Sequence, residues 1–255
     1  MKFSKYHGTG NDFIIIDNRL GDIKLSTSEI AALCHRRFGI GADGLMLLEL
    51  ALGYDFKMVY YNADGHESSL CGNGGRCITA FAKESGLITT TARFLAIDGE
   101  HTATINPDGL IGLHINDVLE INIYERHTIL NTGSPHYVTW VHDAGAIDVY
   151  NEGKKIRQRE EYQPSGINVN FAQLKEDNKL VVRTYERGVE DETLSCGTGV
   201  TAAAIAAAAF TTGIFVTTIE TPGGILQVSF TKHEPLKAVN VVLTGPVVKV
   251  FEGKI

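Results

Sequence analysis

The sequence contains no long hydrophobic run. Its most apolar segment, residues 200–210, is shorter than the roughly 20 residues that a membrane-spanning helix requires. The first ten residues lack the apolar stretch of a secretory signal peptide. We therefore expect a cytoplasmic protein that does not use the membrane as a partner.

The sequence also lacks clusters of basic residues and the spacings of a metal site. With a net charge of −7 and no Lys/Arg stripe, nucleic acid is not an expected partner. The four cysteines and nine histidines form no C-x-x-C or H-x-x-x-H pair, so no metal is predicted. In a reducing cytoplasm the cysteines are expected to be thiols rather than disulfides, and Cys34 and Cys77 fit simple core positions.

What the sequence does contain is one short motif that occurs twice. Residues 67–74 and 192–199 both fit E-[ST]-x-x-C-G-x-G, which places Cys71 and Cys196 at matching positions 125 residues apart. A tyrosine precedes each cysteine by eleven residues. A chain of 255 residues can form two domains of about 120 residues each, and the repeat at half its length favours that division.

Strand-like segments dominate the predicted secondary structure. Three helices are predicted: one begins at the capping box of residues 26–29 and runs to about residue 38, and one begins at each cysteine motif. Because helices do not alternate with strands, the pattern indicates an α+β fold rather than a wound parallel sheet. We predict two pseudo-symmetric domains, each a curled, mostly antiparallel β-sheet around a central α-helix, formed by residues 1–116 with 244–255 and by residues 117–243.

A cysteine at the start of a helix is well placed for acid–base chemistry. The unpaired N–H groups and the positive end of the helix dipole favour an anion, and therefore the thiolate. Two such cysteines on opposite faces of one α-carbon could remove a proton and return it from the other side, which inverts the centre without a cofactor. A phosphate-binding loop is an alternative for the glycine-rich motifs, but neither contains the lysine of a P-loop.

Several polar residues outside the motifs are candidates for ligand binding. Arg187 could hold a second carboxylate through two parallel hydrogen bonds, and Glu186 beside it could bind an ammonium group. Both could instead form a solvated pair at the end of a strand. The asparagines Asn11, Asn62 and Asn168 could equally serve turns, and His136 could be a structural histidine.

Together these segments resemble the diaminopimelate epimerase family. The resemblance rests on HGTGNDF at 7–13, RFGIGADG at 37–44, NADG at 62–65, CGNGGRC at 71–77, TGSPH at 132–136, NVNF at 168–171, ERG at 186–188, CGTG at 196–199 and the final VFEGKI. It implies an isomerase that interconverts LL- and meso-diaminopimelate for lysine and peptidoglycan synthesis in bacteria. It further implies a small-molecule amino-acid substrate, no cofactor and a homodimer.

The resemblance also implies roles for individual residues. Cys71 and Cys196 would be the acid–base pair, with His136 and Glu186 modulating their pKa values. Substrate-binding positions would be Asn11, Asn62, Gly72, Asn73, Asn168, Glu186, Arg187, Gly197 and Thr198.

The chain departs from the family pattern in four places. Gly44 and Ser134 stand at substrate-contacting positions where Gln and Asn are common. The segment 187–193 is one residue longer than usual, and Phe251 replaces a frequent dimer-interface tyrosine. The first three departures concern how the substrate is recognised.

Two alternative functions stay open from the sequence. The first is a racemase of another amino acid, such as histidine or proline, which would share the two cysteines and differ in the distal pocket. The second is a thiol redox or small-ligand binding protein, although the C-x5-C spacing of Cys71 and Cys77 is not that of a redox motif.

Overall fold

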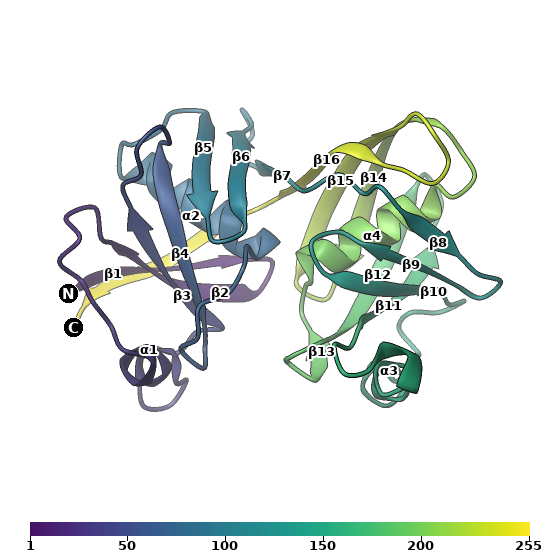
Figure 1. The fold of residues 1–255 in the computed structure, drawn as a ribbon, viewed down its shortest axis with the longest axis horizontal. Helices are drawn as coiled ribbons and strands as arrows, with labels where there is room; N and C mark the ends of the chain where they lie inside the picture. The colour runs from purple at the N-terminus through teal and green to yellow at the C-terminus, as the bar shows by residue number, and fades with distance from the viewer. The chain divides into compact units, whose positions relative to one another are not determined.

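Two units make up the chain, and each is described by itself. The structure is a computed structural model that describes residues 1–255. Unit 1 comprises Met1–Leu113 and Gly245–Ile255, and unit 2 comprises His114–Thr244 (Figure 1). No helix in the structure is both long enough and apolar enough to cross a membrane.

The elements of unit 1 are β1 (Lys2–Gly8), β2 (Asn11–Asp17), α1 (Thr27–Cys34), β3 (Gly44–Glu49), β4 (Phe56–Asn62), α2 (Gly72–Glu84), β5 (Thr91–Ala96), β6 (Gly99–Ile105), β7 (Ile111–His114) and β17 (Val248–Lys254). The elements of unit 2 are β8 (Ile121–Ile123), β9 (His127–Asn131), β10 (Pro135–Trp140), α3 (Val149–Arg157), the short 3-10 helix Glu160–Tyr162, β11 (Asn168–Leu174), β12 (Lys179–Glu186), β13 (Asp191–Thr193), α4 (Gly197–Ala207), β14 (Gly213–Thr221), β15 (Gly224–Lys232) and β16 (Val239–Gly245).

The two units share one strand order. Unit 1 runs β17-β1-β2-β3-β4-β5-β6-β7, and unit 2 runs β8-β9-β10-β11-β12-β14-β15-β16, with β13 added beside β12. The pairs β2–β3 and β4–β5 are parallel, as are β10–β11 and β12–β14, and the other pairs within each unit are antiparallel. Each parallel pair needs a crossover connection, and a helix supplies it: α1 and α2 in unit 1, α3 and α4 in unit 2.

A helix with an unusually apolar or small-residue surface lies at the centre of each sheet. Helix α4 contacts strands β9 to β12, β14 and β15, and almost all of its residues are buried, as its sequence predicts (Figure 1). Helix α2 contacts β1, β2, β3 and β6 in the same way. The predicted α+β fold, with two mostly antiparallel sheets each curled around a helix, is confirmed.

Strands β2 and β3 are buried on both faces. In β2 and β3, Ile14, Ile16, Leu45 and Leu47 pack with Ile30 and the rest of the α1 cluster, while the alternate residues of both strands are buried on the other face. Burial on both faces explains why these parallel neighbours read as continuous apolar runs.

The outer helices differ from the sequence-based prediction. Helix α1 ends at Cys34 rather than near residue 38, because His35 is extended and its Nδ1 accepts hydrogen bonds from the amides of Arg37 and Phe38. Helix α3, the counterpart of α1 in unit 2, was not predicted. It is polar and contains Gly153, whose Cβ position lies 2.4 Å from Tyr185 Cβ, so its place depends on packing against β12.

Candidate active site

Cys71 is the N-cap residue of helix α2. Its backbone is extended, with φ −93° and ψ 128°, and its side chain does not cap the helix. The first turn of α2 contains no acidic residue of its own. The thiol is therefore placed at the positive end of the helix dipole, where a negative charge is stabilised.

Asn11 reaches the Cys71 thiol from the neighbouring hairpin. The β1–β2 turn consists of Thr9 and Gly10, both with positive φ, a two-residue connection that suits glycine and fixes Asn11 as the first residue of β2. Cys71 Sγ donates to Asn11 Oδ1 at 3.4 Å, and Asn73 Nδ2 donates to the same oxygen at 3.3 Å. Three predicted site residues thus form one hydrogen-bonded group.

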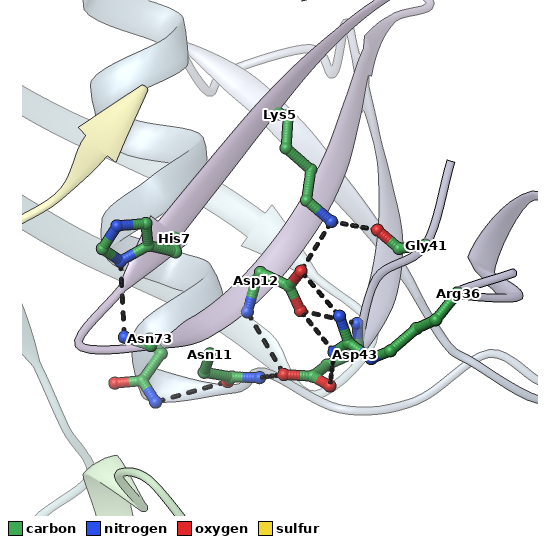
Figure 2. Close-up of polar contacts among 9 residues, drawn as sticks. Lys5, His7, Asn11, Asp12, Arg36, Gly41, Asp43 and Asn73 are labelled. Atoms are coloured by element: carbon green, nitrogen blue, oxygen red, sulfur yellow. Dashed lines mark hydrogen bonds and ion pairs between the residues drawn. The ribbon is translucent and has the colours of Figure 1, made fainter. Parts of the chain in front are cut away.

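A cluster of charged side chains lies beside Asn11, on the side of Asp43 (Figure 2). Asn11 Nδ2 donates to Asp43 Oδ2 at 2.7 Å, and Arg36 bridges Asp43 and Asp12 at 2.6 and 2.8 Å. Lys5, almost fully buried, pairs with Asp12 at 2.7 Å and also donates to the carbonyl of Gly41. Burial alone would raise the pKa of Asp12, but the hydrogen bonds from Arg36 and Lys5 lower it to about 2.

Arg76 is a fully buried cation in the first turns of α2. Its Nη2 donates to Asn73 Oδ1 at 2.9 Å and its Nη1 donates to the carbonyl of Gly72 at 3.3 Å. No carboxylate pairs with it, and its Nε has no hydrogen-bond partner. Burial lowers the pKa of Arg76, whereas the neighbouring sulfurs of Cys77 and Cys71 favour its charged form.

Two further candidates of unit 1 lie on adjacent strands. Asn62 ends β4, is exposed, and stands opposite Gly44 of β3 in the strand register. A Cβ at Gly44 would lie 2.5 Å from the ring of Tyr60 and 2.6 Å from the carbonyl oxygen of Tyr61. The Tyr60 ring therefore occupies the space that the side chain of a larger residue at position 44 would need.

Cys196 occupies the corresponding position in unit 2, as the N-cap of α4. Its φ and ψ are −106° and 109°, and the first turn of α4 likewise contains no acidic residue. Cys196 Sγ lies 3.5 Å from Thr198 Oγ1. Thr132 anchors this turn, because its Oγ1 donates to the carbonyl of Thr198 at 2.8 Å.

Asn168 links two other predicted residues of unit 2, Ser134 and Arg187. Its Nδ2 donates to Ser134 Oγ at 2.9 Å, and its Oδ1 accepts from the backbone N–H of Arg187 at 2.9 Å. Arg187 Nη2 donates to the same Ser134 hydroxyl at 3.2 Å, and Nη1 donates to the carbonyl of Ser165 at 3.1 Å. Arg187 forms no ion pair within the protein, so its guanidinium can donate hydrogen bonds to an external carboxylate.

His136 is fully buried beside β11. Asn170 Nδ2 lies 3.1 Å from His136 Nδ1 and donates to the carbonyl of Tyr137 at 3.1 Å, while Asn170 Oδ1 accepts from Thr184 Oγ1 at 2.9 Å. His136 Nε2 has no hydrogen-bond partner. Burial, with the charge of Arg187 as a smaller cause, lowers the pKa of His136 to about 3, so the ring is neutral.

The other motif residues have structural partners. Glu186 ends β12, half-buried, and the longer segment that follows folds back through Glu190, which accepts from Tyr185 Oη and the amide of Gly188. Glu192, the acidic residue of the second motif, forms two 2.7 Å hydrogen bonds with Arg183. Gly72 and Gly197 are buried as the first residues of their helices.

The remaining two cysteines are reduced core residues. Cys34 and Cys77 are buried, and burial raises the pKa of Cys34 to about 11 and that of Cys77 further still. Both stay protonated at neutral pH. The structure contains no group of three or more His, Cys, Asp or Glu side chains placed to hold a metal ion.

Four residues around the two cysteines were not singled out from the sequence. They are Asp43 and Arg76 in unit 1 and Asn170 and Thr184 in unit 2. Arg76 is a charged residue in the otherwise small and apolar segment 72–82, and Asp43 and Asn170 lie within the segments 37–44 and 168–171 that carry the family resemblance. Asp43, Asn170 and Thr184 lie far in sequence from the cysteines, and only the fold brings them near.

Known structures share this fold over the whole chain. A phenazine biosynthesis protein of the PhzF family from Bacillus anthracis aligns with a TM-score of 0.76 and 14% identity, covering 100% of this chain and 98% of that one. A probable proline racemase from Agrobacterium radiobacter aligns with a TM-score of 0.69 and 15% identity, covering 100% and 92%. At these identities the likeness establishes the fold alone.

The sequence comparisons are more specific. The family described as "Diaminopimelate epimerase" matches residues 3–114 and 128–250. Proteins named "Diaminopimelate epimerase" from Flavobacterium psychrophilum and Chlorobaculum tepidum are 52% and 40% identical, and the alignments cover 100% and 97% of this chain and 100% and 98% of theirs. The chain belongs to the diaminopimelate epimerase family, as the resemblance predicts, and is an isomerase that acts on a small amino acid.

Proposed function

We propose that this protein epimerises LL-diaminopimelate to meso-diaminopimelate by a two-base mechanism that uses Cys71 and Cys196. The observation that carries the proposal is the duplicated geometry: each unit presents one cysteine as the N-cap of its central helix. Full-length relatives named diaminopimelate epimerase support the choice of substrate.

The chemistry requires one thiolate and one thiol. The thiolate removes the α-proton of the substrate, and the electron pair of the broken C–H bond stays on the substrate. The opposite thiol then delivers its proton to the other face of the same carbon, so the centre inverts and no redox change occurs. The N-terminal amides of α2 and α4, including those of Gly72, Asn73, Gly197 and Thr198, would stabilise the reacting carboxylate.

The distal end of the substrate would be held mainly by unit 2. Arg187, which has no internal carboxylate partner, would bind the second carboxylate, with Ser134 and Asn168 fixing its position. We assign the ammonium groups to Glu186 and to the asparagines Asn11 and Asn62. His136 would act on the thiols as a neutral group rather than a cation, because its pKa is lowered to about 3.

The same proposal includes the setting of the enzyme. We infer a bacterial cytoplasmic protein of lysine and peptidoglycan precursor synthesis that forms a homodimer. Exposed apolar residues on β17, namely Val248, Val250 and Phe251, support a contact between copies. Light scattering after size-exclusion chromatography measures the oligomeric state, and a monomer at micromolar concentration contradicts the dimer.

The decisive experiment follows the α-proton. Purified protein is incubated with LL-diaminopimelate in D2O, and NMR should show loss of the α-proton signal together with appearance of the meso isomer. Cys71→Ala and Cys196→Ala should each reduce turnover about 10²–10⁴-fold, which is the contribution that general acid–base catalysis makes per group. Circular dichroism establishes that both variants keep the fold.

A substrate panel separates this function from the alternative racemase. Lysine, histidine and proline lack the second zwitterionic end, so Arg187 and its neighbours would be left without a ligand group. We expect these amino acids to react at least 100-fold more slowly. Proline or histidine racemised as fast as diaminopimelate is epimerised would overturn the assignment.

A further inference from the structure

Two asparagine side chains lie in a row between a buried guanidinium and a carboxylate in unit 1. Arg76 Nη2 donates to Asn73 Oδ1 at 2.9 Å, Asn73 Nδ2 donates to Asn11 Oδ1 at 3.3 Å, and Asn11 Nδ2 donates to Asp43 Oδ2 at 2.7 Å. Figure 2 shows the Asn73, Asn11 and Asp43 part of this row, which we call the amide relay.

The relay has one direction only. A side-chain amide can in general be turned over, which exchanges its oxygen and nitrogen. Here Arg76 can only donate, so it fixes the oxygen of Asn73 toward itself. The Asp43 carboxylate can only accept, so it fixes the nitrogen of Asn11 toward itself. Both asparagines are therefore held in one orientation from both ends.

This direction decides which atom meets the catalytic thiol. Asn11 presents its oxygen to Cys71, whose Sγ lies 3.4 Å from Oδ1. A carbonyl oxygen accepts a hydrogen bond from S–H and so favours the thiol. The same oxygen would repel a thiolate, because its lone pairs would face the negative charge of the sulfur. A reversed amide would donate N–H to the sulfur and favour the thiolate.

We propose that Asp43, acting through Asn11, is a positioning residue that keeps Cys71 in its protonated form in the enzyme without substrate. Asp43 does not touch the sulfur, and its effect depends on the orientation of the Asn11 amide. The proposal rests on the proposed function only in giving Cys71 a catalytic role. In the two-base mechanism Cys71 is then the acid of the resting enzyme.

The charged cluster holds Asp43 in place for this task. Arg36 Nη2 binds Asp43 Oδ1 at 2.6 Å, which leaves Oδ2 for the amide of Asn11 and for the backbone N–H of Asp12 at 3.2 Å. The backbone N–H of Asp43 in turn donates to the carbonyl of Asp12 at 2.9 Å. The carboxylate is thus anchored by both of its oxygens and by its own backbone.

Other charges around Cys71 act in both directions. On α2, the buried Arg76 favours the thiolate, and Cys77 is held neutral by burial. Asp12 and Asp43 favour the thiol through their negative charge, as does Asp98, which accepts from the amide of Leu70 at 3.4 Å. The test must therefore separate the orientation of the amide from the charge of Asp43.

The experiment measures the pKa of Cys71 directly. In a Cys196→Ala background, thiolate absorbance is recorded from about pH 5 to about pH 9, where Cys34 and Cys77 stay silent because burial raises their pKa values. Asp43→Asn should lower the pKa of Cys71 by about one unit, a tenfold gain in thiolate. Asp12→Asn, which removes a charge from the same cluster but leaves the Asn11 amide bonded to Asp43, is the matched control.

The outcomes separate the possibilities. A shift in Asp43→Asn that exceeds the shift in Asp12→Asn and persists in high salt supports the relay, since salt screens the half-exposed charge. Equal shifts in the two variants, or no shift, overturn it. The titration of Cys196, measured in a Cys71→Ala background, should not respond to Asp43→Asn.

A second measurement requires no substitution in the relay. In wild-type protein with labelled asparagine, the Asn11 amide protons should show NMR contacts with the Asp43 side and not with the Cβ protons of Cys71. The reverse pattern overturns the proposal. Neither measurement uses diaminopimelate, so a failure of the proposed substrate and a failure of the relay are distinguishable.

Discussion

At the scale of single residues, Asn170 decides which nitrogen of His136 carries the proton. Thr184 Oγ1 donates to Asn170 Oδ1, and Asn170 Nδ2 donates to the carbonyl of Tyr137, so the amide has one orientation. The second proton of Nδ2 then faces His136 Nδ1, which must accept it at 3.1 Å. His136 is therefore the Nε2–H tautomer, and its buried Nε2 is a donor.

This tautomer is a testable prediction. Nitrogen NMR of labelled histidine should show His136 neutral, protonated at Nε2, and without titration between about pH 5 and 8, because burial lowers its pKa to about 3. Asn170→Asp should convert it to a protonated ring, since a carboxylate beside Nδ1 favours the cation. A wild-type His136 that titrates near its ordinary pKa of about 6.5 contradicts this account.

At the scale of elements, the two central helices start alike and pack differently. Gly74 and Gly199 are equivalent, since each lies three residues after its cysteine. A Cβ at Gly74 would meet ordinary contacts at 3.5 Å, whereas a Cβ at Gly199 would lie 2.3 Å from Asn170 Oδ1. In α4 the Asn170 amide therefore leaves no room for a side chain at this glycine.

The matched pair gives an element-scale prediction. Gly199→Ala should lower the free energy of unfolding by about 1–3 kcal/mol, because the new methyl group displaces a buried hydrogen-bonded amide. Gly74→Ala should be neutral or stabilising by up to about 1 kcal/mol, because alanine favours the helix and space is available. Urea denaturation measures both. Equal losses in the two variants would show that the packing around Asn170 is not the cause.

The elements also show what the sequence could and could not predict. The central helices were predictable because the motif marks where they begin. Strands such as β3 and β15 were predictable because each is a run of apolar or β-branched residues bounded by turn-forming residues. Helix α3 was not, since its polar sequence with an internal glycine is helical only through packing on Tyr185. Asn11, Cys71 and Asn73 were candidates, but the roles of Asp43 and Asn170 depend on long-range hydrogen bonds, which the motifs that contain these residues do not specify.

At the scale of the whole molecule, β17 completes unit 1 from the end of the chain. It pairs antiparallel with β1 from Lys2↔Lys254 to His7↔Val248, and β1 pairs on its other side with β2. Strand β1 therefore lies inside the sheet, which explains why Lys5 is 5% exposed and needs the Asp12 carboxylate of β2 as a partner. The stability of unit 1 at low pH should depend on this pair.

The sign of that dependence follows from the pKa of Asp12. Its pKa is lowered to about 2 in the folded protein, below the ordinary value of 3.8, so the unfolded chain binds the proton first. The stabilisation is complete above about pH 4 and is lost as the pH falls toward 2. With allowance for screening by solvent, its size is about 1–2 kcal/mol.

Asp12→Asn should therefore act in two ways. At pH 7 it should destabilise unit 1 by about 3 kcal/mol, because it leaves the buried Lys5 charge without its partner. Between about pH 4 and pH 2 it should remove the part of the loss of stability that Asp12 contributes, because this carboxyl group is gone. Asp17→Asn is the matched control on the same strand. Asp17 pairs with Arg19 at 2.5 Å, and the side chains of Asp17 and Arg19 are 39% and 32% exposed. Because this pair is exposed, Asp17→Asn should lower the free energy of unfolding by under about 1 kcal/mol. Urea denaturation at pH 7, 4 and about 2.5 measures each variant, and an Asp17→Asn variant as damaging as Asp12→Asn would contradict the importance of the buried pair.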